Sequence, residues 1–208
     1  MEEKGSGGKA GFLEPGEETK EGNISQKGNE INYMKEIVHM IVYFILVICA
    51  VLFIHHFVGQ QIEVSGSSME NTLHNNDHLI LEKITYRFHE PSRFDIVVFQ
   101  PYMTDSDVYY IKRVIGLPGE KIQITGSDIY VNGVLLSEDY GREAIADGGI
   151  AKDGIVLGED EYFLLGDNRN NSKDSRDSGI GPVKRSAVIG RAWLRLWPLK
   201  KFGVLEHQ

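Results

Sequence analysis

The sequence predicts a mostly β, antiparallel domain that is preceded by one N-terminal transmembrane helix. The first observation is an apolar run, because no Asp, Glu, Lys or Arg occurs between Glu36 and Glu63. The second is the series of short segments that follows, each rich in β-branched and aromatic residues and bounded by turn signals. The third is that this second part shows no helical period. A helix that crosses a membrane once, followed by antiparallel strands, accounts for all three.

Composition limits the classes of partner. The chain has 208 residues, 25% of them charged, with a formal net charge of −8. A nucleic-acid partner is disfavoured, because neutralising phosphates requires a clustered basic surface. Cys49 is the only cysteine, so neither an intramolecular disulfide nor a cysteine zinc site is available.

The first part of the chain divides into a tail and an anchor. Residues 1–33 are rich in Gly, Glu, Lys and Ser and predict a disordered tail. Residues 34–59 predict a transmembrane helix, since 40–54 is apolar throughout and about 20 such residues cross a bilayer. The alternative is a cleaved secretory signal, whose apolar core is shorter and whose cut site has small residues.

The flanking charges predict the orientation of this helix. Lys20, Lys27 and Lys35 precede it, whereas the first basic residue after it is Lys83. Positive residues favour the cytoplasmic side of a membrane. The tail is therefore expected in the cytoplasm and the β-rich domain, residues 60–208, outside it.

Seven segments of this domain predict strands: 78–88, 94–100, 108–116, 121–125, 128–136, 161–166 and 187–197. Asn132-Gly133 between apolar residues indicates a two-residue hairpin, and Pro118-Gly119 suits a tight turn. Residues 137–158 are rich in Gly and Asp and predict a surface excursion.

The stretch VSGSSMENTL contains three candidate nucleophiles, Ser65, Ser67 and Ser68. A serine hydroxyl is a weak nucleophile until a neighbouring base accepts its proton. One candidate set of bases is the histidines outside the apolar run and the C-terminus, namely His74, His78 and His89. Spacing alone leaves a Ser-His-Asp triad open, because its members meet only in the fold.

The other candidate base lies in YYIKRVIG, where Lys112 and Arg113 interrupt an apolar strand. Alternation puts Tyr110, Lys112 and Val114 on one face and Arg113 on the other. Arginine keeps its proton in proteins, whereas burial lowers a lysine pKa from about 10.4 towards neutrality. If either residue is the base, it is Lys112. The alternative is a lysine that reaches solvent from a strand edge.

A third notable stretch is GDNRNNSKDSRDSGIG, residues 166–181. It does not fit a calcium loop. Starting at Asp167 puts Arg169 at a ligand position, and starting at Asn168 leaves no Gly at the sixth place and no Glu at the twelfth. Residues of this type also form ordinary turns, so chemistry alone leaves the role of the stretch open.

Four stretches together resemble the conserved boxes of bacterial type I signal peptidases: GSSMENTL, RFDIVVF, YYIKRVIGLPGEKI and YFLLGDNRNNSKDSR. They share the order and spacing of that family and follow an N-terminal membrane helix, as in its short Gram-positive-like form. The resemblance implies a serine endopeptidase in the cell membrane that removes signal peptides from exported preproteins. It also implies a Ser-Lys dyad with no metal or organic cofactor, and two partners, signal peptides and the lipid bilayer.

The resemblance also implies roles for individual residues. Ser68 matches the nucleophile, and Lys112 matches the general base. Ser172 matches the hydroxyl that orients the lysine amine, while Asp174 and Arg176 match a supporting ion pair. The Ser68 amide is the expected oxyanion donor. Gly66 stands where some relatives have a serine, which implies one donor fewer. Five residues match family positions that line shallow pockets for small substrate side chains: Val64, Met69, Leu73, Tyr110 and Ile111.

One residue departs from the family motif, because Asn71 replaces its proline. Asn tolerates unusual backbone angles and bonds locally, so we expect a retained turn with more mobility.

The segment RAWLRLWPL near the C-terminus bears on membrane contact. Alternation predicts two faces, one with Ala192, Leu194 and Leu196 and the other with Trp193, Arg195 and Trp197. A Trp-Arg-Trp face suits the lipid interface. Two tryptophans buried within a sheet are an equally open alternative.

Two other functions compete with a signal peptidase. One is a signal-peptidase-like assembly factor that binds pilin or another secreted protein without cutting it. Such factors usually lack the Ser or the Lys, and this chain has both. The other is a self-cleaving regulator with the same dyad, which is expected to carry a DNA-binding domain in place of the membrane helix.

Overall fold

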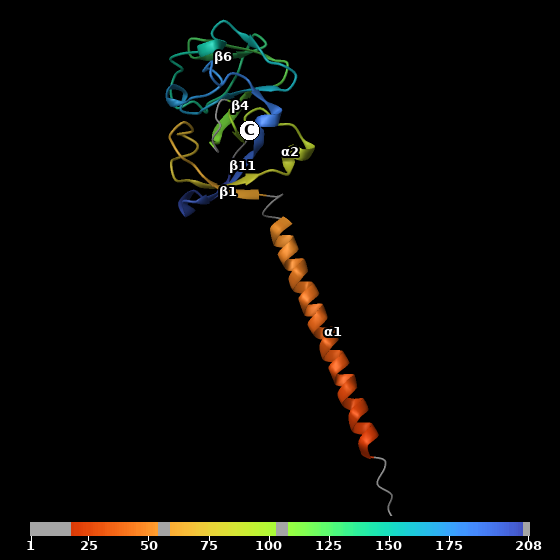
Figure 1. The fold of residues 1–208 in the computed structure, drawn as a ribbon. Helices are drawn as coiled ribbons and strands as arrows, with labels where there is room; N and C mark the ends of the chain where they lie inside the picture. The colour runs from red at the N-terminus through yellow and green to blue at the C-terminus, as the bar shows by residue number, and fades with distance from the viewer. Residues whose placement is uncertain (1–17, 54–58, 103–107, 206–208) are drawn as a thin grey trace, which may run out of the picture. The chain divides into compact units, whose positions relative to one another are not determined.

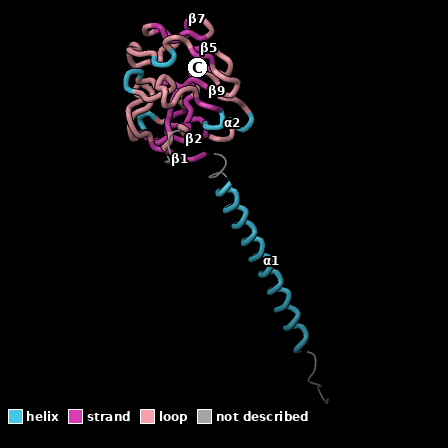
Figure 2. Tube along the Cα trace, turned by 45° about the horizontal axis from the view of Figure 1, so that its top comes forward, coloured by secondary structure: helices cyan, strands magenta, loops and turns pink. Residues whose placement is uncertain are grey.

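The computed structural model describes residues 18–53, 59–102 and 108–205, with side chains of the first segment described from residue 32 onward. The chain divides into two units, Met1–Val51 and Leu52–Gln208. The described strands all lie in the second unit (Figure 1). Figure 2 shows that this unit consists of strands and loops with only short helical turns. The predicted fold class, a mostly β antiparallel domain after one apolar helix, is confirmed.

Helix α1 (Glu18–Phe53) starts earlier than predicted. Residues 18–33, expected in a disordered tail, are helical, and residues 1–17 lie outside the described part. Once the apolar segment has nucleated a helix, each further residue adds a hydrogen bond without a second nucleation cost. The section Asn32–Phe53 is long and apolar enough to cross a membrane, and its side chains are exposed. Residues 54–58 are not described, and the predicted last helical residue, Gly59, begins a strand instead.

The larger sheet has the strand order β1-β2-β11-β3-β4-β9-β10, and β12 also pairs with β11. Its strands are β1 (Gly59–Glu63), β2 (His78–Glu82), β3 (Ile96–Phe99), β4 (Tyr110–Gly116), β9 (Glu161–Leu165), β10 (Val183–Lys184), β11 (Val188–Trp197) and β12 (Gly203–Val204). Every described pairing is antiparallel. Strand β3 is central and buried along its whole length, as its continuous apolar run indicates.

A smaller sheet has the order β7-β6-β5-β8. It consists of β5 (Lys121–Thr125), β6 (Asp128–Val131), β7 (Val134–Leu135) and β8 (Ile155–Val156). Asn132 and Gly133 join β6 to β7 with φ angles of 52° and 82°, so the predicted hairpin turn is confirmed. In Figure 1, β6 and β1 lie at opposite ends of the domain.

Residues 137–158 are more than the surface excursion that we predicted. Ile145, Ala151 and Leu157 are buried in a core with Ile122 and Phe163. Strand β8 lies within the segment and extends the smaller sheet. The Gly and Asp residues of the segment form its turns, while its few apolar residues provide the anchoring.

Short helical turns connect the strands. They are α2 (Thr85–Phe88), η2 (Gly149–Ala151), η3 (Arg169–Asn171), η4 (Arg185–Ala187) and η5 (Leu199–Lys201). The predicted strand 78–88 therefore ends at Glu82, and α2 follows it. The Thr85 N–H at the start of this turn, which has no partner within the turn, donates to Glu82 Oε1 at 2.7 Å.

Strand β11 corrects the predicted Trp-Arg-Trp face. Against β2, its register shifts between Ala192 and Leu194 and again between Arg195 and Trp197. A β-bulge places an extra residue in one strand and so resets the alternation of side chains. Arg195 consequently turns inward and is buried, whereas Trp193 and Trp197 are 39% and 52% exposed. The alternative of two buried tryptophans is wrong.

Candidate active site

Ser68 lies in a turn that follows β1 and is held by the backbone. The Glu70 N–H donates to the Ser67 carbonyl at 3.1 Å, and the Leu73 N–H donates to the Met69 carbonyl at 2.8 Å. The side chains of Met69 and Leu73 are buried in a core under the turn. The turn is therefore anchored by packing as well as by hydrogen bonds, and Ser68 stays only partly buried.

Asn71 adopts a φ angle of 96° in this turn. Proline cannot adopt this angle, because its ring fixes φ near about −65°. Asn is one of the few residues other than glycine that tolerate positive φ. The turn is retained, in a backbone conformation that the motif's proline could not share.

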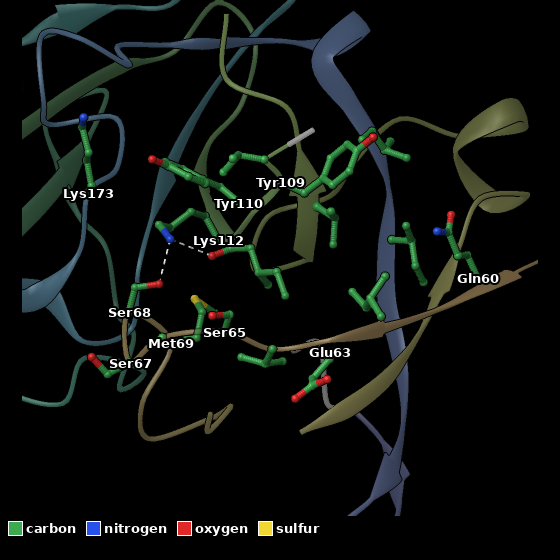
Figure 3. Close-up of a pocket in the computed structure, with 18 of the residues that line it drawn as sticks. Gln60, Glu63, Ser65, Ser67, Ser68, Met69, Tyr109, Tyr110, Lys112 and Lys173 are labelled. Atoms are coloured by element: carbon green, nitrogen blue, oxygen red, sulfur yellow. Dashed lines mark hydrogen bonds between the residues drawn. The ribbon is translucent and has the colours of Figure 1, made fainter. Parts of the chain in front are cut away.

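Lys112 meets Ser68 from strand β4. Its Nζ atom lies 2.8 Å from Ser68 Oγ and also donates to the Ile111 carbonyl at 2.9 Å (Figure 3). The lysine is buried, and its amine lies 5.4 Å from the centre of the Tyr110 ring. The snorkelling alternative is therefore wrong, because the side chain points inward to a serine.

Burial lowers the pKa of Lys112 from its ordinary 10.5 to about 8, and the negative charges of Asp174 and Asp167 oppose this shift. Desolvation disfavours the ammonium form, since an apolar setting solvates charge poorly. A neutral amine within hydrogen-bond distance of a hydroxyl can act as a general base.

The other candidate groups are placed differently. Ser67 Oγ accepts a hydrogen bond from Asn171 Nδ2 at 2.8 Å, and Ser65 is exposed. His74 and His78 contact Lys201 and Gln61. Within the described residues, no histidine is hydrogen-bonded to a serine, so the structure gives the triad alternative no support.

Asp174 and Arg176 form a buried ion pair with an Nε to Oδ1 distance of 2.8 Å. The other carboxylate oxygen of Asp174 accepts the Gly166 N–H at 3.1 Å. The Ser172 hydroxyl is buried and has no hydrogen-bond partner in the described part of the chain. The expected contact between Ser172 and the Lys112 amine is thus not formed in this structure.

Gly166 brings these groups together because it has no side chain. A Cβ atom there would lie 2.5 Å from the Ser68 carbonyl oxygen and would also overlap Ser172 Oγ. Ser68 and Ser172 therefore approach each other across Gly166, at a position where only glycine fits.

Sequence reasoning missed a second buried network. Arg113 donates to both carboxylate oxygens of Asp167, at 2.9 and 2.8 Å, and Thr72 Oγ1 donates to Asp167 at 2.5 Å. The Asn168 N–H donates to the Ser68 carbonyl at 3.0 Å. The signal was present in the sequence, because an arginine within an apolar strand requires a buried carboxylate partner. Because Arg113 already neutralises this carboxylate, the role of Asp167 is structural.

A cleft of about 690 Å³ runs along the candidate dyad. Four of the predicted substrate-binding residues line it: Val64, Met69, Tyr110 and Ile111. The fifth, Leu73, does not, because it is fully buried in the core beneath the turn. That expectation from the resemblance was wrong, since a match to a motif position does not show which side of a turn the side chain faces.

The amides near Ser68 differ in availability. The Gly66 N–H donates to Asn75 Oδ1 at 2.9 Å and is therefore engaged. In the described part of the chain, no hydrogen bond engages the Ser68 N–H. The Ser68 amide thus remains available to a developing oxyanion.

Comparison with known proteins identifies the family of the chain. A family model described as signal peptidase, peptidase S26, matches residues 36–197. "Probable signal peptidase I-2" of Synechocystis is 42% identical over 158 residues, 73% of this chain and 69% of that protein. Signal peptidase I of Bacillus caldolyticus is 37% identical over 166 residues, 74% of this chain and 88% of that protein.

Among solved structures, a signal peptidase I from Enterococcus faecalis is 36% identical, with a TM-score of 0.42, and covers 50% of this chain and 97% of that one. The family match spans most of the chain and includes both Ser68 and Lys112. The chain therefore belongs to the signal peptidase family, peptidase S26, a family of serine proteases.

Proposed function

We propose that the chain is a membrane-anchored endopeptidase that cleaves N-terminal signal peptides from exported preproteins, with Ser68 as nucleophile and Lys112 as general base. The observation that carries this proposal is the 2.8 Å contact between Lys112 Nζ and Ser68 Oγ, made by a lysine whose pKa burial lowers to about 8.

The proposed reaction has two steps. The neutral Lys112 amine takes the Ser68 proton as Oγ attacks the scissile carbonyl carbon, and the Ser68 N–H donates to the oxyanion. The Lys112 ammonium then gives its proton to the leaving amine, and an acyl-enzyme remains. In the second step Lys112 takes a proton from water, the resulting hydroxide attacks the ester, and the proton returns to Ser68.

We assign supporting roles to the residues around the amine. The Asp174–Arg176 pair fixes the loop that carries Ser172, through the bond from the Gly166 N–H to Asp174. The Ser172 hydroxyl is the group that orients the Lys112 amine during turnover. This role is supported by the burial of the Ser172 hydroxyl without a hydrogen-bond partner. Such an unpaired hydroxyl costs about 1–3 kcal/mol, which a new hydrogen bond would recover.

The cleft suggests how a signal peptide binds. Strand β1 pairs on one side only, with β2, and Tyr110 to Lys112 of β4 lack a partner on the side away from β3 among the described strands. Both segments contribute residues to the lining of the same cleft. An extended peptide can pair with such edges, while Val64, Met69 and Ile111 leave space for small side chains.

Membrane attachment is the second part of the proposal. We assign the Asn32–Phe53 section of α1 as a single span in the cell membrane, with the N-terminus in the cytoplasm and the β domain outside. The β domain itself carries an apolar surface of Trp193, Trp197, Leu199 and Phe202, all exposed, with Lys200 and Lys201 beside it. Indoles and lysines together suit the lipid interface.

A cleavage assay tests this function. Detergent-solubilised full chain is expected to cut a preprotein to its mature form, and Ser68→Ala and Lys112→Ala are expected to abolish the cut. Ser127→Ala and Lys184→Ala, at exposed positions, are the matched controls and should cut normally. Persistent cleavage by Ser68→Ala would refute the dyad. Binding of the precursor without release of a product would favour the assembly-factor alternative.

A further inference from the structure

The active-site cleft has an apolar wall, with polar residues at both ends: Gln60 and Lys83 at one end, and Asn171 and Lys173 at the other. Its apolar lining comes mainly from the strands of the larger sheet, and includes Ile62, Val64, Val98, Tyr109, Ile111 and Ile189. Asn171 and Lys173, from the loop that begins with η3, contribute polar groups. In Figure 3, Gln60 lies far from Ser68 along the cleft, while Lys173 lies on the opposite side of the dyad.

The apolar wall formed by the larger sheet gives the cleft a direction. An apolar signal peptide gains most from the lining of the larger sheet, because burying apolar surface is favourable. The scissile bond must lie at Ser68 Oγ. The first residues of the mature segment then leave past Ser68, on the side of Asn171 and Lys173.

Lys173 is the available cation on that side. Its side chain is exposed and has no hydrogen bond or ion pair within the described residues. Its backbone is nevertheless fixed, because the next residue, Asp174, is buried against Arg176. Asn171 is held beside it by the bond to Ser67 Oγ. By contrast, Lys83 at the other end donates to Gln60 Oε1 at 3.0 Å.

We propose that Lys173, with Asn171 beside it, forms a subsite for an acidic side chain among the first residues of the mature segment. This inference rests on the proposed function, because it assigns the chemistry of the same substrate beyond the cut. An ammonium attracts a carboxylate, and the Asn171 amide supplies a further donor. The subsite makes the enzyme favour preproteins whose mature chain begins with an acidic residue nearby.

Peptide substrates test this subsite on the full chain in detergent. Three series share one signal-peptide sequence and carry Asp, Asn or Lys at the first, second or third mature position. At one of these positions, the wild type is expected to show a kcat/KM about threefold higher for Asp than for Asn, the size typical of an exposed ion pair. Lys173→Glu is expected to reverse the order, so that Lys exceeds Asp. The Asp preference should shrink in 1 M salt, where the Debye length is about 3 Å.

Lys83→Glu is the matched control, because it makes the same charge change at the other end of the cleft. It should keep the wild-type ratio of Asp to Asn substrates. The inference is overturned if wild-type ratios are one at all three positions, or if Lys173→Glu leaves them unchanged. If the wild type cuts none of the peptides, the proposed function itself fails and this inference falls with it.

Discussion

The Nζ atom of Lys112 lies 2.8 Å from the Oγ atom of Ser68, although 44 positions separate the two residues in the chain. Strand β4 supplies the lysine, and the turn after β1 supplies the serine. Their meeting depends on Asn168, whose N–H donates to the Ser68 carbonyl, and on Gly166, which leaves room for that carbonyl. The reactivity of the pair thus depends on geometry and burial, and both can be tested.

The pH dependence of cleavage should report the pKa of Lys112. Because the neutral amine is the active form, kcat/KM is expected to rise with pH through the Lys112 pKa of about 8 and then level off. The measurement is a pH–rate profile with a short peptide substrate. A midpoint near 10.5 would show that burial does not perturb the amine.

The same burial should make folding stability depend on pH. Between the folded pKa of about 8 and the ordinary value of 10.5, the unfolded chain binds more protons than the folded chain. The free energy of unfolding should therefore rise with pH across this window, by at most about 3 kcal/mol. Denaturant unfolding at pH 7 and pH 10.5 measures the rise. Lys112→Met should lack this contribution, and equal slopes in both proteins would contradict it.

Restoring the proline of the family motif is expected to damage this enzyme. Asn71 has a φ of 96°, so Asn71→Pro must either break the turn or shift Ser68, and a loss of at least tenfold in kcat/KM is expected. Asn71→Gly, which tolerates this angle, should stay within about threefold of the wild type. A proline variant as active as the wild type would show that the turn adopts another backbone.

Gly166→Ala should lower kcat/KM by about a hundredfold, although it replaces neither Ser68 nor Lys112. The added methyl group would lie 2.5 Å from the Ser68 carbonyl oxygen, so the serine turn must move. A displacement of about 1 Å costs about a hundredfold in rate. Gly141→Ala is the matched control, because its Cβ would meet nothing closer than 3.6 Å. Equal activity of the two variants would refute this packing argument.

Much of the fold followed from local patterns. Short-range sequence patterns indicate three kinds of element: the strands around Ile122 and Phe163, the Asn132-Gly133 turn, and the apolar helix. The helix start at Glu18 was missed, because the composition of residues 18–33 does not indicate a helix. These residues extend a helix that the apolar segment has already nucleated, and extension has a lower cost than nucleation.

Some features of the candidate site were also predicted from the sequence, and others were missed. The resemblance proposed Ser68 and Lys112, and the structure places them in contact. The orientation of Leu73 and the partner of Arg113 were missed, because both depend on which side of a turn faces the interior. Tertiary packing sets that side, and the residue order alone does not.

The two bulges of β11 against β2 let neighbouring side chains face opposite environments. Arg195 forms an ion pair with Asp77 at 3.2 Å and donates to the Thr72 carbonyl in the serine turn, while Trp193 and Trp197 remain outside. Deleting a residue outside the bulges would shift the pairing with β2 by one position and exchange these assignments, sending an indole inward and a guanidinium outward. This strand is consequently intolerant of insertions and deletions, even where point substitutions are harmless.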